Sequence, residues 1–232
     1  LRPGTIDGRR PVLPRTPALD EGSAEAGLGD PTRRTAAGRR GDTCHIDVVD
    51  SAGNLVSATP SGGWLDSSPY IPEVGFCLGS RAQMFWLQPG LPSSLKPGTR
   101  PRTTLTPSLA LRDGEPWMAF GTPGGDQQDQ WSLAFFLAVV HGGLDLQAAI
   151  EAPCYHSDHF PSSFAPRAAR PGVLVVEDRL GAATIDELRR RGHRIEDAGS
   201  WALGRMSAVA REGAVRLGAA NPRGVQGYAC GR

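Results

Sequence analysis

The sequence predicts an α+β fold built around a mainly antiparallel sheet, and two observations lead to this prediction. Three stretches alternate apolar and polar residues about a short turn, which is the pattern of a β-hairpin. Two further stretches carry apolar residues at helical spacing. Hairpins interleaved with helices are typical of an α+β sandwich. The expected hairpins span residues 43–59, 108–120 and 206–219, and the expected helices span residues 127–141 and 184–192.

The first hairpin is expected where Cys44, Ile46 and Val48 alternate with polar residues, before a turn that contains Gly53. The other two hairpins also turn on a glycine, at Gly114 and Gly213. Glycine favours such turns because it adopts a positive φ without steric cost.

Both helices carry a stop signal, since glycine follows their last apolar residue. The first has apolar residues at helical spacing, and the second is predicted to open on a capping box from Thr184 to Glu187. The apolar positions of the first are Trp131, Phe135 or Phe136, Leu137 and Val140.

Residues 1–42 differ in composition from the rest of the chain. They are rich in arginine, glycine and proline and contain no aromatic residue. Such a segment buries too little apolar area to offset the entropy of ordering it. We therefore expect a flexible arm over 1–42 and a packed domain over 43–232.

Composition excludes several classes of function. The chain is 39% hydrophobic and 21% charged, with a formal net charge of +1, so we expect no nucleic-acid partner. No apolar stretch is long enough to span a bilayer, so we expect no membrane partner. The sequence leaves the compartment open, and we favour the cytoplasm. The residues that follow Leu1 do not form the apolar core of a signal peptide, so export would need a signal encoded upstream.

Neither cysteine nor histidine spacing predicts a metal site. The four cysteines form no CxxC pair, which disfavours zinc and favours buried free thiols. His156 and His159 lie close together in the sequence, but no third ligand accompanies them, so we expect a surface loop there.

Thr43 stands where the arm meets the first predicted strand. A threonine freed at its amino terminus can attack an acyl group with its hydroxyl while its own α-amine accepts the proton. An α-amine has an ordinary pKa of about 8, close enough to neutral for this role. The structural alternative is that Thr43 simply opens a strand, which threonine favours.

Several turn motifs follow Thr43 in a specific order. They are Asp50-Ser51-Ala52-Gly53-Asn54, Thr59-Pro60-Ser61-Gly62-Gly63, Arg100–Pro107, Gly121-Thr122-Pro123-Gly124-Gly125 and Asn221-Pro222-Arg223. In this order the chain from Thr43 onward resembles the small subunit of the γ-glutamyltranspeptidase family, whose members are amino-terminal-nucleophile hydrolases. The resemblance implies the carboxyl-terminal part of an αββα sandwich, self-cleavage between Asp42 and Thr43, and a large subunit encoded upstream as partner.

The resemblance also assigns catalytic roles. Ser61 stands where the family has a second hydroxyl that hydrogen-bonds the nucleophile, and Gly124 and Gly125 match the paired glycines whose N–H groups face the oxyanion. The local alternatives are that Ser61 is an ordinary turn serine and that the two glycines begin the following helix.

Substrate-binding positions depart from the family pattern. Thr103 and Thr104 align with two serines that contact a substrate carboxylate, and Arg102 adjoins them. Where classical members bind an amino acid with Asn, Gln and an acid, this chain has Gly63, Arg81 and Met84. We therefore expect specificity for γ-glutamyl groups to give way to other carboxyacyl groups.

Two hypotheses about function remain at this stage. The first is a γ-glutamyltransferase-like amidohydrolase or acyltransferase, which acts on a small-molecule amide such as a glutathione-type substrate and needs no metal or organic cofactor. The second is a catalytically silent homologue or fragment that serves as a structural or binding subunit.

Overall fold

The computed structural model describes residues 43–62, 68–164, 166–223 and 227–231. Within these ranges the chain divides into two compact units. The larger unit holds residues 43–61, 104–160 and 170–231, and the smaller unit holds residues 62–103 and 161–169. The predicted arm, residues 1–42, lies outside the described residues.

A four-stranded antiparallel sheet forms the centre of the larger unit. Its strands follow the order β11-β10-β6-β5. The second and third predicted hairpins are confirmed, because β5 pairs with β6 and β10 pairs with β11. The bounds are β5 Ser108–Arg112, β6 Glu115–Gly121, β10 Ser207–Glu212 and β11 Val215–Ala220.

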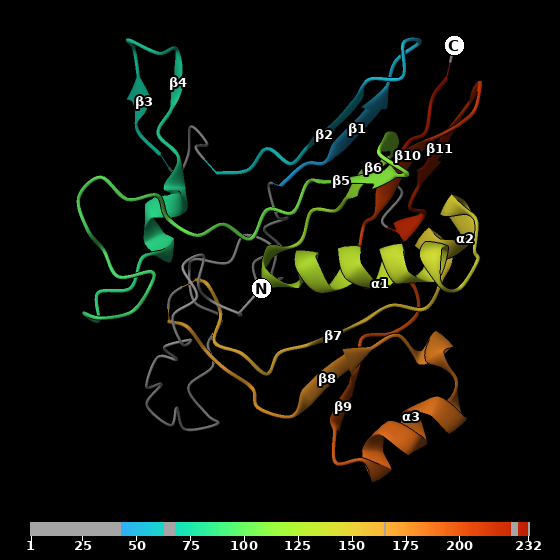
Figure 1. Cartoon of the computed structure of the whole chain (residues 1–232). Helices are drawn as coiled ribbons and strands as arrows, with labels where there is room; N and C mark the ends of the chain where they lie inside the picture. Colours follow the sequence, from blue (N-terminus) through green and yellow to red (C-terminus); the bar gives the residue numbers. More distant parts are fainter. Residues whose placement is uncertain (1–42, 63–67, 165, 224–226, 232) are drawn as a thin grey trace. The chain divides into compact units, whose positions relative to one another are not determined.

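Two helices, α1 (Gln128–Val140) and α2 (Leu146–Glu151), pack on one face of this sheet. Figure 1 shows α1 running across the strands. The core joins helix and sheet side chains, with Phe120 of β6 lying 5.4 Å from Phe135 of α1 between ring centroids. The first predicted helix is thus confirmed. Its apolar face is only partly buried, however, because Leu137 and Val140 are each 42% exposed.

The first predicted hairpin, β1 (Ile46–Val49) and β2 (Leu55–Ala58), is also confirmed and packs on the other face of the sheet. The Ser57 hydroxyl donates to the carbonyl of Phe120 in β6. The Ser207 hydroxyl of β10 donates to the Asp47 carboxylate at 2.8 Å. The larger unit therefore stacks a hairpin, a sheet and a helical layer.

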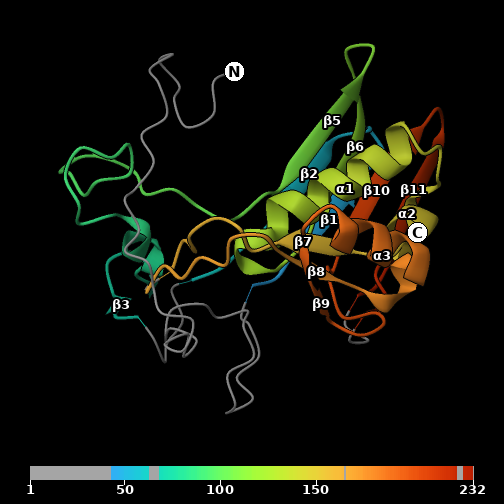
Figure 2. The ribbon, with the colours of Figure 1, turned by 90° about the horizontal axis from the view of Figure 1, so that it is seen from below.

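A second sheet of the larger unit lies alongside α1, as the two views of Figures 1 and 2 agree. It contains β7 (Tyr155–Ser157), β8 (Val173–Val176) and β9 (Arg194–Asp197). Gln130 of α1 joins the two by exchanging hydrogen bonds with the backbone of Ser157. The β8 and β9 strands are parallel, whereas the other strand pairs named here are antiparallel, so the prediction of mainly antiparallel sheets is met.

The parallel pair β8–β9 is connected through the short 3-10 helix η3 (Asp178–Leu180) and α3 (Ala182–Arg190). The predicted capping box at Thr184 is wrong, because α3 begins two residues earlier, after Gly181. Gly181 has a φ of 84°, which redirects the chain into the helix without a side-chain cap. The predicted end near Gly192 is confirmed.

A buried ion pair joins the carboxyl-terminal motif to β8. Arg223 is 4% exposed and makes two contacts with the fully buried Glu177 carboxylate, at 3.0 and 3.2 Å. It also donates to the carbonyls of Ile150 and Ala152. Burial alone would raise the pKa of Glu177, but the hydrogen bond from Arg223 and its charge lower that pKa instead. Arg223 thereby holds α2, β8 and the chain end together.

Replacing Arg223 with methionine should destabilise the protein, because the buried Glu177 carboxylate loses two hydrogen bonds from Arg223 and keeps Arg179, at 3.0 Å, as its remaining cation. Hydrogen bonds to a charged group contribute about 1.5–3 kcal/mol. The midpoint of urea unfolding of the complete protein measures this change. Arg189→Met is the matched control, since Arg189 pairs with Asp186 on the exposed surface of α3 and its loss should cost under about 1 kcal/mol. Equal midpoints for the two variants would contradict the assigned role of Arg223.

The described part of the smaller unit contains two short strands and one 3-10 helix. These are β3 (Tyr70–Ile71) paired with β4 (Phe76–Cys77), and η1 (Ser80–Met84). Arg167 fastens this unit internally, because its guanidinium donates to the carbonyls of Gln83 and Phe85. Met84 is fully buried, so it serves as a core residue of this unit.

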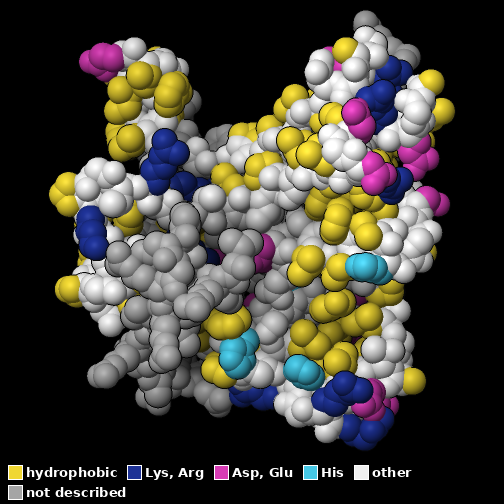
Figure 3. All heavy atoms as spheres, viewed as in Figure 1, with side chains coloured by type: hydrophobic (Ala, Val, Ile, Leu, Met, Phe, Trp, Pro, Cys, Tyr) yellow, Lys and Arg dark blue, Asp and Glu magenta, His cyan; other side chains and the backbone are white. Residues whose placement is uncertain are grey.

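Large apolar side chains are exposed on both outer layers of the larger unit. On the hairpin layer Ile46 is 54% and Val56 53% exposed, and on the helical layer Leu133 is 57% exposed. Figure 3 shows apolar side chains gathered around α1. Val48 of the hairpin layer and Leu137 and Val140 of the helical layer are also exposed, as are Leu109 and Leu111 on strand β5 of the central sheet. Soluble monomers rarely leave so many large apolar side chains exposed together.

The cysteines are free, as predicted, but only partly buried. Cys44 and Cys230 are exposed, which corrects the expectation of buried thiols. Burial raises the pKa of the Cys154 thiol to about 12, so this cysteine is protonated at neutral pH. In the described part of the chain, no helix is both long and apolar enough to cross a membrane.

Candidate active site

Thr43 lies just ahead of β1, and its hydroxyl faces Ser61, which follows β2. The two hydroxyl oxygens are 2.8 Å apart, and Thr43 is 9% exposed. The hairpin brings them together, because the backbone N–H of Cys44 donates to the carbonyl of Pro60 and continues the β1–β2 pairing. The sequence prediction that Ser61 contacts Thr43 is thus matched by a direct contact between the two side chains.

The next pairs along the same hairpin are also polar. His45 Nδ1 lies 2.7 Å from the Thr59 hydroxyl, and the Ser57 hydroxyl donates to Asp47 at 2.9 Å. His45 Nε2 lies 2.9 Å from the other Asp47 oxygen, and both side chains are 2% exposed. We call the three cross-strand pairs Thr43–Ser61, His45–Thr59 and Asp47–Ser57 the hydroxyl ladder. It fixes the orientation of the residues that lead to Thr43.

Gly124 and Gly125 follow β6 and precede α1. Gly125 begins the short 3-10 helix η2 (Gly125–Gln127), which runs into α1. The two glycines therefore do begin the following helix, as the local alternative predicted. Gly124 has a φ of 140°, and a Cβ there would lie 2.3 Å from Cζ3 of Trp131. Glycine is therefore required at position 124 both by the backbone and by the packed indole.

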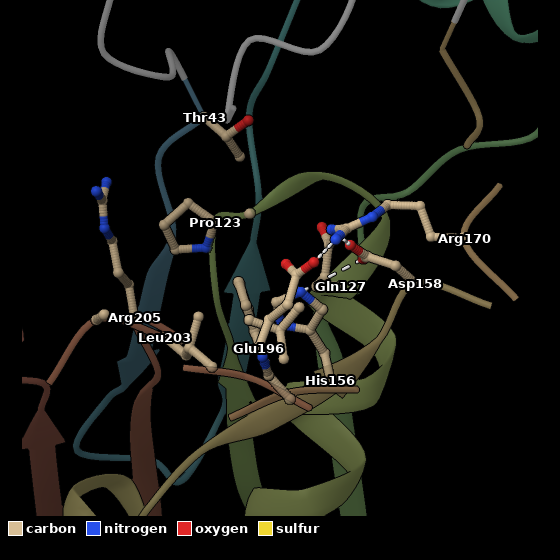
Figure 4. A pocket seen from close by; sticks show the side chains of 14 residues that line it. Thr43, Pro123, Gln127, His156, Asp158, Arg170, Glu196, Leu203 and Arg205 are labelled. Carbon is tan, nitrogen blue, oxygen red and sulfur yellow. Dashed lines mark hydrogen bonds and ion pairs between the residues drawn. The ribbon is translucent and has the colours of Figure 1, made fainter. Parts of the chain in front are cut away.

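A cavity of about 310 Å³ lies within the larger unit, and Thr43 and Gly124 both line it. Figure 4 shows Thr43 at one end of this cavity, with the charged side chains of Asp158, Arg170 and Glu196 at the other. The residues that line the cavity come from segments that are far apart in the sequence. The remaining walls are Pro123, Gln127, Trp131, His156, Val175, Ala202, Leu203, Gly204 and Arg205.

Asp158 is the centre of a charged cluster in this cavity. Arg170 lies 3.0 Å from one of its oxygens and also pairs with Glu196, and His156 Nε2 lies 3.4 Å from the other oxygen. Burial alone would raise the pKa of Asp158. The hydrogen bond and charge of His156, with help from Gln127 and Arg170, outweigh burial and hold this pKa at about 2. Asp158 is therefore ionised at neutral pH.

The expectation of a surface loop around His156 is wrong. His156 lies in β7 and is 7% exposed, because Trp131 packs edge-on against its ring. Of the two histidines His156 and His159, the second is exposed on the surface. Sequence reasoning missed this cluster, although the spacing of His156 and Asp158 by two residues, the period of one strand face, was the available signal.

The predicted substrate-binding residues do not line the cavity. Arg81, Arg102 and Thr103 belong to the smaller unit, and Thr104, in the larger unit, is buried away from the cavity walls. Gly63 and the predicted cleavage residue Asp42 lie outside the described residues. In the ranges that the structure describes, no three His, Cys, Asp or Glu side chains converge as a metal site.

Comparison with known proteins supports the resemblance. The family described as Gamma-glutamyltranspeptidase matches residues 17–231. An acylase ACY 1 proenzyme from Pseudomonas sp. (strain SE83) is 30% identical over 77% of this chain and 30% of its own length. An oxamate amidohydrolase proenzyme from Klebsiella pneumoniae is 32% identical over 79% of this chain and 34% of its own. A solved structure of a variant of LmbA2991 is 62% identical, with a TM-score of 0.76 over 84% of this chain and 35% of that one.

The two curated relatives are named as an acylase and an amidohydrolase proenzyme, and the fold of this chain is similar to that of the LmbA2991 variant. The chain belongs to the γ-glutamyltranspeptidase family. It spans about a third of the length of the curated relatives it matches.

Proposed function

We propose that this chain is the nucleophile-bearing part of an amidohydrolase or acyltransferase that cuts itself between Asp42 and Thr43. The observation that supports this proposal best is the contact between the Thr43 and Ser61 hydroxyls beside a cavity that Gly124 also lines. A buried hydroxyl pair at the edge of a cavity suits a nucleophile and a residue that orients it.

Self-cleavage begins with attack of the Thr43 hydroxyl on the carbonyl of Asp42. The C–N bond breaks, the hydroxyl proton passes to the freed amine, and the product is an ester between Asp42 and the Thr43 oxygen. Water then hydrolyses this ester, leaving a carboxylate on Asp42 and a free α-amine on Thr43. This amine becomes the base for the next reaction.

An amide substrate then acylates the Thr43 oxygen. The Thr43 amine takes the hydroxyl proton during attack and returns it to the departing amine. Water, or an acceptor amine, releases the acyl group from the ester. We assign the backbone N–H groups of Gly124 and Gly125 to the tetrahedral oxyanion, because Gly124 lines the same cavity as Thr43 and a glycine backbone can approach a ligand closely.

The partner proposed from the sequence is a large subunit from the upstream part of the same precursor. Two observations support it: the chain spans about a third of its relatives' length, and apolar side chains are exposed on both outer layers of the larger unit. A partner that covers these layers would complete the αββα sandwich.

The test uses protein expressed from the complete coding sequence. Mass spectrometry should detect a chain that begins at Thr43, and brief exposure to an amide substrate should add the mass of one acyl group to that chain. The catalytically silent alternative would be favoured by a protein that stays uncut and never gains this mass.

The preferred substrate should be a small dicarboxylic monoamide rather than an amide of the γ-glutamyl group. The sequence lacks the acid that would bind a substrate ammonium, since Met84 at that place is a buried core residue. The oxamate amidohydrolase among the relatives is named for such a monoamide. A site lacking a partner for a charged group rejects it by up to ~10⁴-fold.

This specificity is measured as kcat/KM for two anilides, one carrying a γ-glutamyl group and one carrying the same chain without its ammonium. We expect the second to be hydrolysed faster. A strong preference for the γ-glutamyl anilide would show that the alignment of the loop around Arg81 and Met84 is wrong.

A further inference from the structure

Thr122 is a fully buried side chain in the segment that links β6 to the glycines assigned to the oxyanion. Its hydroxyl carries one proton and makes two hydrogen bonds. It donates to the carbonyl of Pro123 at 2.7 Å, and it accepts from the backbone N–H of Arg205 at 3.0 Å. The reaction steps proposed for Thr43 do not use this hydroxyl.

These two contacts arise where the pairing of β6 with β10 ends. The last pair in the register is Gly121 with Ser207. The same register would place Pro123 opposite Arg205, but proline has no backbone N–H and cannot continue the ladder. The Thr122 hydroxyl bridges the two chains at this point, because it joins the Arg205 N–H to the Pro123 carbonyl. A side chain therefore extends the pairing beyond the last backbone pair.

The carbonyl that Thr122 holds belongs to the same peptide group as the N–H of Gly124. A peptide group is planar and trans, so its carbonyl and its N–H point in opposite directions. Fixing the Pro123 oxygen against Thr122 therefore fixes the direction of the Gly124 N–H. No described residue accepts a hydrogen bond from this N–H, as a donor to a substrate oxygen requires.

The Thr122 hydroxyl also strengthens this N–H as a donor. A hydrogen bond to the oxygen of an amide polarises the amide, and hydrogen bonds in a chain strengthen one another. The chain here runs from the Arg205 N–H through the Thr122 hydroxyl to the Pro123 carbonyl. Because Thr122 is 0% exposed, water does not compete for these contacts.

Close packing holds the two ends of this segment. A Cβ at Gly121 would lie 2.3 Å from Cε1 of His45, and a Cβ at Gly124 would lie 2.3 Å from Cζ3 of Trp131. The backbone at both ends therefore has little room to move. The remaining freedom is rotation of the peptide group ahead of Gly124, and the Thr122 hydroxyl restrains this rotation.

We propose that Thr122 is a positioning residue for the oxyanion, because its hydroxyl sets the direction of the Gly124 N–H and strengthens it as a donor. This inference rests on the proposed function, since it explains how one assigned oxyanion donor is prepared. Thr122 does not line the cavity, so it acts through the peptide group and touches no reacting atom. Figure 4 shows Pro123, whose carbonyl it holds, on the wall of the cavity that Thr43 also lines.

The first test measures turnover of one anilide by protein expressed from the complete coding sequence, normalised to the cut fraction. Thr122→Val replaces the hydroxyl with a methyl group, so the Pro123 carbonyl loses its donor. We expect kcat to fall about tenfold, less than the ~10²–10³-fold cost of losing an oxyanion donor outright, while KM stays within about twofold. Thr122→Ser keeps the hydroxyl and should retain most of the wild-type kcat. Thr122→Ala repeats the loss without added bulk, in case the valine variant does not fold.

The second test separates positioning from a general loss of structure, using two inhibitors that share the acyl chain. A boronic acid adds to the Thr43 oxygen, the hydroxyl proton passes to the Thr43 amine, and the adduct is a tetrahedral anion at the oxyanion position. The corresponding primary alcohol has no charged oxygen there. Thr122→Val should weaken inhibition by the boronic acid about tenfold and leave inhibition by the alcohol unchanged. Equal weakening of both inhibitors would overturn the proposal.

Ser108→Ala is the control for losing a hydroxyl that donates to a backbone carbonyl. Ser108 donates to the carbonyl of Thr106 at 3.0 Å, and neither residue lines the cavity. Its loss should leave kcat and both inhibition constants unchanged.

The outcomes distinguish this proposal from the proposed function. If amides are hydrolysed and a folded Thr122→Val protein keeps full kcat and full inhibition by the boronic acid, the positioning role fails and the reaction stands. A serine variant as impaired as the valine variant has the same meaning. If the wild-type protein hydrolyses no amide but binds the boronic acid about tenfold more tightly than Thr122→Val does, the reaction fails and the positioning role stands. A wild-type protein that neither hydrolyses amides nor binds the boronic acid overturns both.

Discussion

Replacing Thr43 with alanine should leave the precursor uncut and abolish amide hydrolysis. Alanine removes the hydroxyl that lies 2.8 Å from Ser61, and the same oxygen is assigned to self-cleavage and to acyl transfer. Removing a nucleophile that works as part of a unit costs about 10⁶-fold in rate, so turnover should fall below detection. Gel electrophoresis and mass spectrometry report the cut, and release of nitroaniline reports the activity.

Thr43→Ser is the matched control, because serine keeps the hydroxyl and loses only a methyl group. It should still be cut and retain measurable turnover. An alanine variant that is cut at the same bond would remove Thr43 from the mechanism. A folded, uncut alanine variant that still hydrolyses amides would place the nucleophile elsewhere.

The second large effect is expected for Gly124→Ala. A Cβ at this position would meet the Trp131 ring at 2.3 Å, and a φ of 140° is unfavourable for any residue with a side chain. The backbone must therefore shift, which moves the N–H groups assigned to the oxyanion. Losing one such donor costs about 10²–10³-fold in kcat.

Gly213→Ala separates the cost of positive φ from the effect on the cavity. Gly213 has a φ of 60° in the β10–β11 turn, with open space around its missing Cβ. It should lower stability by about 1–2 kcal/mol and leave kcat unchanged. A Gly124→Ala protein that is folded and has full kcat would show that this segment does not face the oxyanion.

The elements that sequence reasoning predicted are those whose pattern is local. The β1–β2 hairpin and α1 follow from alternation or helical spacing within one segment, and the structure confirms both. The short α2 was missed because six residues hold too little periodicity to stand out. The β8–β9 pair was missed because parallel strands are brought together by a connection that no local signal announces.

The candidate site divides in the same way. The contact of Thr43 with Ser61 is reachable from sequence, because the hairpin turn sets which residues of the two strands face each other. The wall formed by His156, Asp158 and Arg205 is not, since these residues come from strands and loops far apart in the chain. Arg205 belongs to no sequence motif, so the sequence alone does not predict that it lines the same cavity as Thr43.

The hydroxyl ladder has a consequence for how much this hairpin can vary. Successive side chains of a strand point to opposite faces, so slipping β1 by one residue against β2 would turn Thr43 away from Ser61 and expose Asp47 and His45. The number of residues between the turn and Thr43 can therefore change only in steps of two if Thr43 is to keep facing the same side of the hairpin. Length changes can be absorbed within the loop at 51–54. A single residue inserted between 43 and 49 should separate the Thr43 hydroxyl from Ser61 and abolish the proposed self-cleavage.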